Sequence, residues 1–204
     1  MPTFAERILA QVALIHARGV YRRFQRNLAD VEAAQTQAMQ RALSLVAHSD
    51  FGRRNSLARV RTPNDLRQAL PLQRYDDLRN DIDRVWDGHT TALFRPGQRI
   101  LMFATSSGTT ARPKRIPVTP EFVDDYRRGW NTFGLKMLTD HSDAVLRAIL
   151  QGSGRHDAEL SPTGVPCGAI TGLLAATQKG VVRRFYVGRP EIAHLAEPAA
   201  RYYT

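Results

Sequence analysis

The sequence predicts an α/β protein in which N-terminal helices pack on a partial mixed or parallel sheet. Apolar residues recur at helical spacing early in the chain, and a continuous apolar run at residues 100–104 indicates a buried strand. Predicted strands then alternate with predicted helices, as in α/β proteins. The expected organisation is an N-terminal helical region over residues 1–98, followed by a partial α/β domain over residues 99–204.

Residues 4–47 are expected to form two helices. In the first, apolar residues recur at helical spacing: Phe4, Ile8, Val12 and Ile15. Asp30 is a suitable N-cap for the second, because its short side chain can accept a hydrogen bond from a free N–H of the first turn. The second helix carries one face of small and apolar residues: Ala34, Ala38, Ala42 and Leu45. The two helices are expected to pack on each other or on a larger body.

The pattern of residues 50–61 is irregular and predicts no regular element. A short helix follows over residues 63–69, with Thr62 or Asn64 as its cap and a proline in its first turn. A longer helix is predicted over residues 75–86, and the glycine two residues later ends it.

The longer helix contains a group of aspartates: Asp76, Asp77, Asp81 and Asp83. Grouped carboxylates suggest a metal site. The alternative is a solvated acidic face near a helix start, where the helix dipole favours negative charge. We favour the second interpretation and assign no metal ligands.

The predicted sheet begins at residues 99–104, whose apolar run is typical of a strand covered on both faces. A second short strand is expected at residues 114–118. A Thr-Pro pair at residues 119–120 then starts a long helix that runs to about residue 139. A third strand is predicted at residues 144–150.

Residues 151–168 are dense in Gly and Pro and are expected to form a long functional or mobile loop. The pattern then predicts a helix over residues 169–178, a strand over 181–187 and further helix from residue 190. The final residues do not complete a helix. We therefore expect a truncated chain whose sheet lacks strands.

The chain of 204 residues carries 29 Lys and Arg against 19 Asp and Glu, a formal net charge of +10. Such a surplus can attract nucleic acid, a membrane surface or an anionic ligand. The basic residues are scattered singly or in pairs, without interleaved aromatics or a recognition helix. A basic nucleic-acid-binding protein is thus a less favoured hypothesis, which filter binding with a steep salt dependence would support.

Cys167 is the only cysteine, which excludes an intrachain disulfide and fits a reducing compartment. Polar and charged residues interrupt the apolar N-terminus, so it does not match a secretory signal. No segment approaches the length of a membrane span. We expect a cytoplasmic protein without a membrane partner.

The most informative stretch is FATSSGTTARPKRIPVT at residues 103–119, where a run of Ser, Gly and Thr follows the predicted strand. Gly108 allows successive main-chain N–H groups to converge on one point, and Lys114 adds a positive charge. Hydroxyl donors surround the glycine: Ser106, Ser107, Thr109 and Thr110. A polyphosphate needs this combination of many donors with positive charge.

The stretch is not a Walker A loop, because its Lys follows Pro and leads into a strand, and it lacks the further glycines of a dinucleotide fingerprint. SSGTTARPK instead resembles the Ser/Thr-Ser-Gly-Thr-Thr-Gly-x-Pro-Lys signature of acyl-adenylating enzymes. The wider sequence resembles the Gretchen Hagen three family, the auxin-responsive acyl-acid amido synthetases and their bacterial relatives. Further segments carry this resemblance: HSDFGRR (48–54), PLQRYDDLR (71–79), VPCGAITGL (165–173) and RYYT (201–204).

The resemblance implies a fold similar to the truncated large domain of an acyl-adenylating enzyme. It also implies that the chain is the N-terminal part of an ATP-dependent acid–amino acid ligase. Such a ligase uses ATP and Mg²⁺ to turn a carboxylic acid into an acyl-adenylate, which an amino acid then attacks to give an amide. The resemblance also implies phosphate-binding residues, namely Ser106, Ser107, Gly108, Thr109 and Thr110, with Lys114 assisting catalysis. The electrostatics agree, because a carboxylate attacking a phosphate is repelled until the phosphate charge is neutralised.

In the family, the helix after the loop helps to form the acid pocket, and Trp130 and Phe133 fall at matching positions. They are three residues apart and so share a helix face. Two interpretations stay open: they stack on the acid substrate, or they are ordinary core aromatics.

The sequence departs from the family at Ala111, where family members usually have Gly. If that position needs a positive φ, alanine costs on the order of 1 kcal/mol. The family's motifs for ribose, adenine and Mg²⁺, and its small C-terminal domain, are expected beyond Thr204. The alternative to a ligase is therefore a non-catalytic truncated remnant or pseudoenzyme, and pyrophosphate exchange with a panel of acids distinguishes the two.

Overall fold

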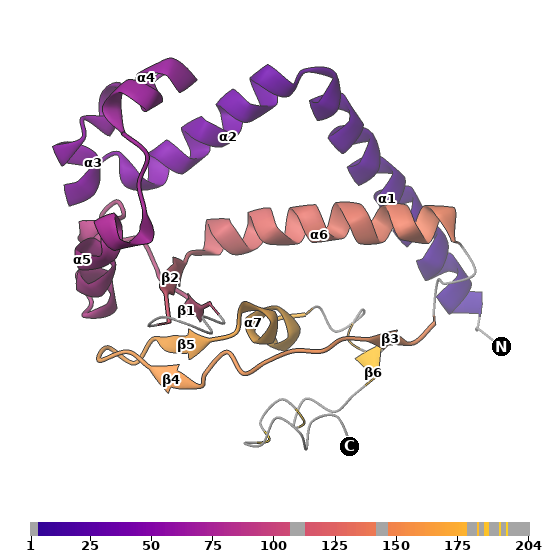
Figure 1. Cartoon of the computed structure of the whole chain (residues 1–204). Helices are drawn as coiled ribbons and strands as arrows, with labels where there is room; N and C mark the ends of the chain where they lie inside the picture. The colour runs from indigo at the N-terminus through magenta and orange to yellow at the C-terminus, as the bar shows by residue number, and fades with distance from the viewer. Residues whose placement is uncertain are drawn as a thin grey trace. The chain divides into compact units, whose positions relative to one another are not determined.

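The structure is a computed structural model (Figure 1). It describes residues 4–106, 113–141 and 147–178, together with Arg183, Tyr186, Val187, Ile192 and Leu195. Contacts divide the chain into two units, the first containing Met1–Ala34, Glu121–Gln151 and Lys179–Gly188, and the second containing Gln35–Pro120, Gly152–Gln178 and Arg189–Thr204. The expected boundary between residues 98 and 99 stays a prediction. In the described part of the chain, no helix has the length and apolar character needed to cross a membrane.

The first unit contains two long helices, α1 (Phe4–Ala29) and α6, which begins at the unit boundary and covers Pro120–Asp140. α1 was predicted from apolar periodicity and α6 from the Thr-Pro pair at residues 119–120, and the Pro120 start of α6 is confirmed. The two helices contact each other through a cation–π pair, in which Lys136 Nζ lies 5.3 Å from the centroid of the Tyr21 ring.

A small parallel pair of strands also belongs to the first unit. It joins β3 (Ile149–Leu150) to β6 (Tyr186–Val187) and is separate from the four-stranded sheet. The strands predicted at residues 144–150 and 181–187 are thus described as strand only over their last two residues. The helix predicted from residue 190 lies outside the described residues, apart from two isolated positions.

The helices α2 (Val31–Val46) and α4 (Pro63–Ala69) begin at side-chain caps, as predicted. Asp30 Oδ1 accepts a hydrogen bond of 3.0 Å from the Ala33 N–H. At α4, Thr62 Oγ1 accepts from the Asp65 N–H at 3.1 Å, and Asp65 Oδ2 accepts from the Thr62 N–H at 2.8 Å. This capping box makes Thr62, rather than Asn64, the cap.

Residues 50–61, for which no regular element was predicted, contain α3 (Asp50–Arg54) and a 3₁₀ turn, η1 (Leu57–Arg59). The buried Ser49 hydroxyl caps α3 by accepting from the Gly52 N–H at 2.9 Å. Periodicity misses such elements because each spans little more than one helical turn. Leu57 of η1 belongs to a buried cluster with Leu43, Ala47 and Val60, and Phe51 of α3 packs against that cluster.

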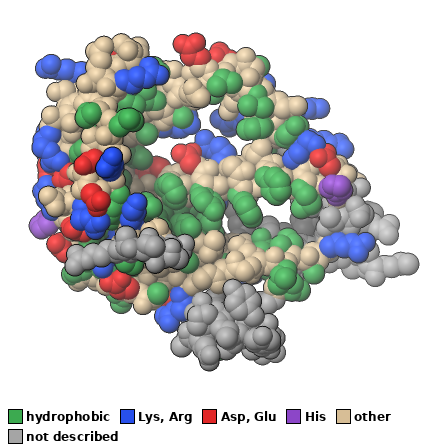
Figure 2. All heavy atoms as spheres, in the orientation of Figure 1, with side chains coloured by type: hydrophobic (Ala, Val, Ile, Leu, Met, Phe, Trp, Pro, Cys, Tyr) green, Lys and Arg blue, Asp and Glu red, His purple; other side chains and the backbone are tan. Residues whose placement is uncertain are grey.

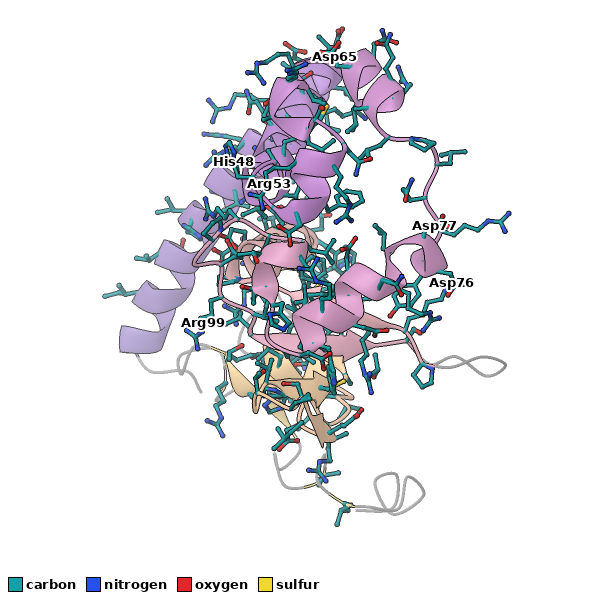
Figure 3. All side chains as sticks on the ribbon, turned by 90° about the vertical axis from the view of Figure 1, so that its left-hand side faces the viewer. His48, Arg53, Asp65, Asp76, Asp77 and Arg99 are labelled. Atoms are coloured by element: carbon teal, nitrogen blue, oxygen red, sulfur yellow. The ribbon has the colours of Figure 1, made fainter. Side chains whose placement is uncertain are left out.

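α5 (Tyr75–Trp86) agrees with prediction, and Gly88 follows it at φ +101°, the left-handed conformation that ends helices. Its aspartates are not a simple solvated face. Asp76 pairs with Arg79 in the first turn, where Figure 3 labels Asp76 and Asp77. Asp81 corrects the prediction outright: it is buried, and its Oδ2 accepts from Arg54 Nη2 at 2.5 Å. A buried carboxylate is retained where a cation neutralises it.

The second unit contains a four-stranded sheet in the order β2-β1-β5-β4 (Figure 1). Its strands are β1 (Met102–Thr105), β2 (Arg115–Val118), β4 (Glu159–Leu160) and β5 (Pro166–Gly168). β1 runs antiparallel to β2 and parallel to β5, so the sheet is mixed and β1 is central, as its apolar run predicted. The prediction of a long loop over residues 151–168 was wrong, because β4 and β5 lie within it.

The core of the sheet forms where α5 meets β1. The Trp86 and Phe103 rings pack edge to face, with centroids 4.9 Å apart. Phe103 and its parallel-strand neighbour Cys167 are almost fully buried. Burial raises the pKa of the Cys167 thiol, so this cysteine is kept in its neutral form. These packed rings fix the strand that leads into the Ser/Gly/Thr segment.

α7 (Ile170–Ala176) follows β5, and the segment before β4 crosses closely over both. The Ala169 N–H donates to the Arg155 carbonyl at 2.7 Å. A Cβ at Gly168 would lie 2.3 Å from the Arg155 carbonyl oxygen, and one at Gly172 would lie 2.2 Å from the Gly154 carbonyl oxygen. Two main-chain segments approach each other here at distances that only glycine allows.

Candidate functional site: the loop between β1 and β2

The predicted phosphate loop connects β1 to β2 and covers residues 106–114. Its ends, Ser106 and Lys114, are described. Four predicted phosphate-binding residues, Ser107, Gly108, Thr109 and Thr110, lie outside the described residues, as does Ala111. Their roles stay proposals. What the structure gives is the frame that carries the loop.

The loop is closed at its base by hydrogen bonds between its two ends. The Ser106 N–H donates to the Lys114 carbonyl at 3.2 Å, and the Lys114 N–H donates to Ser106 Oγ at 3.3 Å. The first of these bonds extends the antiparallel β1–β2 pairing by one step beyond Thr105 and Arg115. The loop is therefore the tip of a hairpin.

Lys114 is exposed, and its ammonium lies over an aromatic ring. Nζ is 5.5 Å from the centroid of the Tyr75 ring, at the start of α5. Arg79, one turn further along α5, places its guanidinium carbon 5.0 Å from the same centroid. Arg79 also pairs with Asp76, and that contact raises the pKa of the guanidinium. An anionic ligand near Lys114 would thus meet two basic side chains, Lys114 and Arg79, at the same aromatic ring.

The Tyr75 hydroxyl bonds to the main chain of the residue after Lys114. It accepts from the Arg115 N–H at 2.9 Å and donates to the Arg115 carbonyl at 3.2 Å. Sequence analysis did not find this contact. The partners are 40 positions apart, and a tyrosine at a helix start gives no local signal of it.

The side chain of Arg115 is held by two further elements. Its guanidinium carbon lies 3.8 Å from the centroid of a Trp86 ring, and Nη2 lies 3.0 Å from Glu159 Oε1 on β4. Arg115 was not singled out by its sequence, because it is one of many scattered arginines. These two contacts hold the Arg115 side chain against other elements, whereas the Lys114 side chain is exposed.

The two aromatic residues proposed for the acid pocket lie on α6, in the other unit. The Trp130 and Phe133 rings are 6.3 Å apart at 38°, so they form a pair on one helix face, as predicted. Their exposed fractions are 61% and 67%, so neither ring is buried by the described residues. Figure 2 shows hydrophobic side chains gathered along this helix.

The described residues contain no group of three or more His, Cys, Asp and Glu side chains that could hold a metal ion. Of the α5 aspartates, Asp76 pairs with Arg79 and Asp81 pairs with Arg54.

The fold matches that of solved amido synthetases. A GH3.15 acyl acid amido synthetase superposes with a TM-score of 0.67 at 18% sequence identity, covering 90% of this chain and 32% of its own. AtGH3.15 acyl acid amido synthetase in complex with 2,4-DB gives a TM-score of 0.57 at 17% identity, covering 91% and 31%. The chain thus has the α/β architecture of the large domain of such enzymes, and it spans about a third of their length.

Residues 20–204 match the model of the GH3 family N-terminal domain. The chain belongs to the GH3 family, as its motifs predicted. A comparison with curated proteins finds no match.

Proposed function

We propose that the chain is the N-terminal part of an ATP-dependent ligase that activates a carboxylic acid as an acyl-adenylate and joins it to an amino acid as an amide. The observation that carries the proposal is the SSGTTARPK loop, placed at the tip of the β1–β2 hairpin in a GH3-family chain. The two solved structures that share this fold are named as acyl acid amido synthetases, which supports the same reaction class. The proposed compartment is the cytoplasm.

In this proposal, the loop neutralises the phosphates of ATP. Ser106, Ser107, Thr109 and Thr110 supply hydroxyl donors, Gly108 frees main-chain N–H groups, and Lys114 supplies charge. The donor set fits a polyphosphate, because it combines many neutral donors with a solvent-facing ammonium. Bringing a carboxylate to a phosphate that is already negative is the electrostatic obstacle, and these groups act on it.

Trp130 and Phe133 are proposed to hold the acid. An exposed aromatic pair offers a flat apolar surface on which an aromatic or alkyl acid can stack. The amino acid and Mg²⁺ are proposed to bind groups outside this chain.

The test is a double substitution, Ser107→Ala with Lys114→Ala, introduced into the full-length protein. ATP binding is measured by calorimetry, and activation by acid-dependent pyrophosphate exchange over a panel of acids. We expect both to be lost. Lys136→Ala removes an equal charge from a lysine that pairs with Asp140 on α6, and it is expected to behave like the wild type. Unchanged ATP affinity in the double variant would show that the loop is only a tight turn.

A further inference from the structure

β2 is the edge strand of its sheet, so alternate residues turn their main-chain groups away from β1. The inward residues include Lys114 and Val118, whose carbonyls accept bonds from the β1 side. Arg115 and Pro117 therefore face the outer edge. Pro117 has no N–H to leave unpaired there, which suits an edge position.

At Arg115 the outer edge is occupied by Tyr75. The tyrosine hydroxyl pairs with both the N–H and the carbonyl of Arg115, at 2.9 and 3.2 Å, much as a neighbouring strand would. Tyr75 is itself fixed, because it opens α5 directly after Arg74, whose N–H donates to Asp77 Oδ2 at 2.6 Å. The start of α5 thus fixes the position of Tyr75, and the Tyr75 hydroxyl binds the edge strand at Arg115.

The same ring lies under the Lys114 ammonium, at 5.5 Å. One side chain therefore contacts the proposed phosphate-binding cation and the main chain of the next residue. We propose that Tyr75 is a positioning residue of the phosphate loop: its hydroxyl fixes the strand that follows Lys114, and its ring orients the Lys114 side chain. This inference rests on the proposed function of the loop.

Two substitutions separate the two contacts. Tyr75→Phe keeps the ring and removes the hydroxyl, whereas Tyr75→Leu removes both. Without the hydroxyl, the Arg115 N–H and carbonyl bond only to water, and the loop base loses a contact that restrains it. A polyanion must then restrain the loop base when it binds, which costs affinity. We expect Tyr75→Phe to weaken tripolyphosphate binding about five- to tenfold and Tyr75→Leu to weaken it further.

The first measurement is amide hydrogen exchange of the unliganded chain by NMR. In Tyr75→Phe, we expect the Arg115 amide to exchange at least about tenfold faster, because its acceptor is gone. The Leu101 amide, directly before β1, donates to the Val118 carbonyl of β2 at 2.8 Å and should keep its rate. An unchanged Arg115 exchange rate, or an equal acceleration of both amides, would overturn the proposal that the Tyr75 hydroxyl locally fixes the strand at Arg115.

The second measurement is a calorimetric titration of the chain and its variants with inorganic tripolyphosphate. The control is Tyr21→Phe. The Tyr21 ring on α1 also makes a cation–π contact with a lysine, Lys136, but it lies far from the loop in sequence. Wild-type affinity in this control and weaker binding in Tyr75→Phe support the proposal, and equal affinity in all variants overturns it. If the wild-type chain binds no tripolyphosphate, the phosphate function fails, while the Arg115 exchange rate still decides whether Tyr75 holds the loop base.

Discussion

Replacing Gly168 by alanine is expected to destabilise the second unit strongly. A Cβ on Gly168 would lie 2.3 Å from the Arg155 carbonyl oxygen and 2.9 Å from the His156 carbonyl carbon. Both atoms belong to the main chain, so no change of rotamer relieves the overlap. The Arg155 carbonyl also accepts the 2.7 Å bond from Ala169, and moving it away would break that bond.

The magnitude follows from these two effects. Forcing extra atoms into a packed site costs about 1–3 kcal/mol. Losing a main-chain hydrogen bond costs about 1 kcal/mol more. The free energy of unfolding should therefore fall by about 2–4 kcal/mol. At a slope of about 2 kcal/mol per molar urea, the unfolding midpoint moves down by about 1–2 M.

The assay is urea unfolding followed by circular dichroism, with Gly129→Ala as the matched control. Gly129 lies within α6, and a Cβ there would meet nothing within 4 Å. Alanine favours a helix interior over glycine by about 1 kcal/mol, so the control midpoint should stay or rise. A wild-type midpoint for Gly168→Ala would show that the main chain of Arg155 and His156 does not pack closely against Gly168 of β5.

Three further outcomes are expected. Phe103→Ala should lower the free energy of unfolding by about 3–5 kcal/mol in the same urea assay, since its ring is buried against Trp86. Trp130→Ala should leave the urea midpoint unchanged, because the ring is exposed, but weaken acid binding in calorimetry. Asp65→Ala should lower the midpoint at neutral pH. Hydrogen bonds to the Asp65 carboxylate, with the largest effect from the Arg61 N–H, lower the pKa of Asp65. Protonation of Asp65 removes this stabilisation, so the gap between the wild-type and variant midpoints should shrink as the pH falls below about 4.

Elements defined by local chemistry were predictable from the sequence. The Thr62–Asp65 capping box, the glycine after α5 and the apolar run of β1 each act within a few residues. The hairpin loop was found for the same reason, because its hydroxyls, glycine and lysine are consecutive.

Elements defined by distant partners were not predictable. β5 is three residues long, in a stretch dense in Gly and Pro, and it exists as a strand because it pairs with β1. Asp81 is charged and buried because Arg54, 27 positions earlier, reaches it. Tyr75 has its role for the same reason. In each case the stabilising contact forms only after the chain has folded.

One aromatic side chain, Trp86, contacts both strands that carry the loop. Trp86 packs on Phe103 of β1 on one side, and its ring also lies under the Arg115 guanidinium, on β2. The two strands that carry the loop are thus tied to the same residue of α5, while Glu159 and Tyr75 hold Arg115 from other directions. Binding sites act best when their supports are already ordered, since less freedom is lost on binding. The contacts at the loop base are made within the chain itself, as the proposed phosphate-binding role requires of a preorganised support.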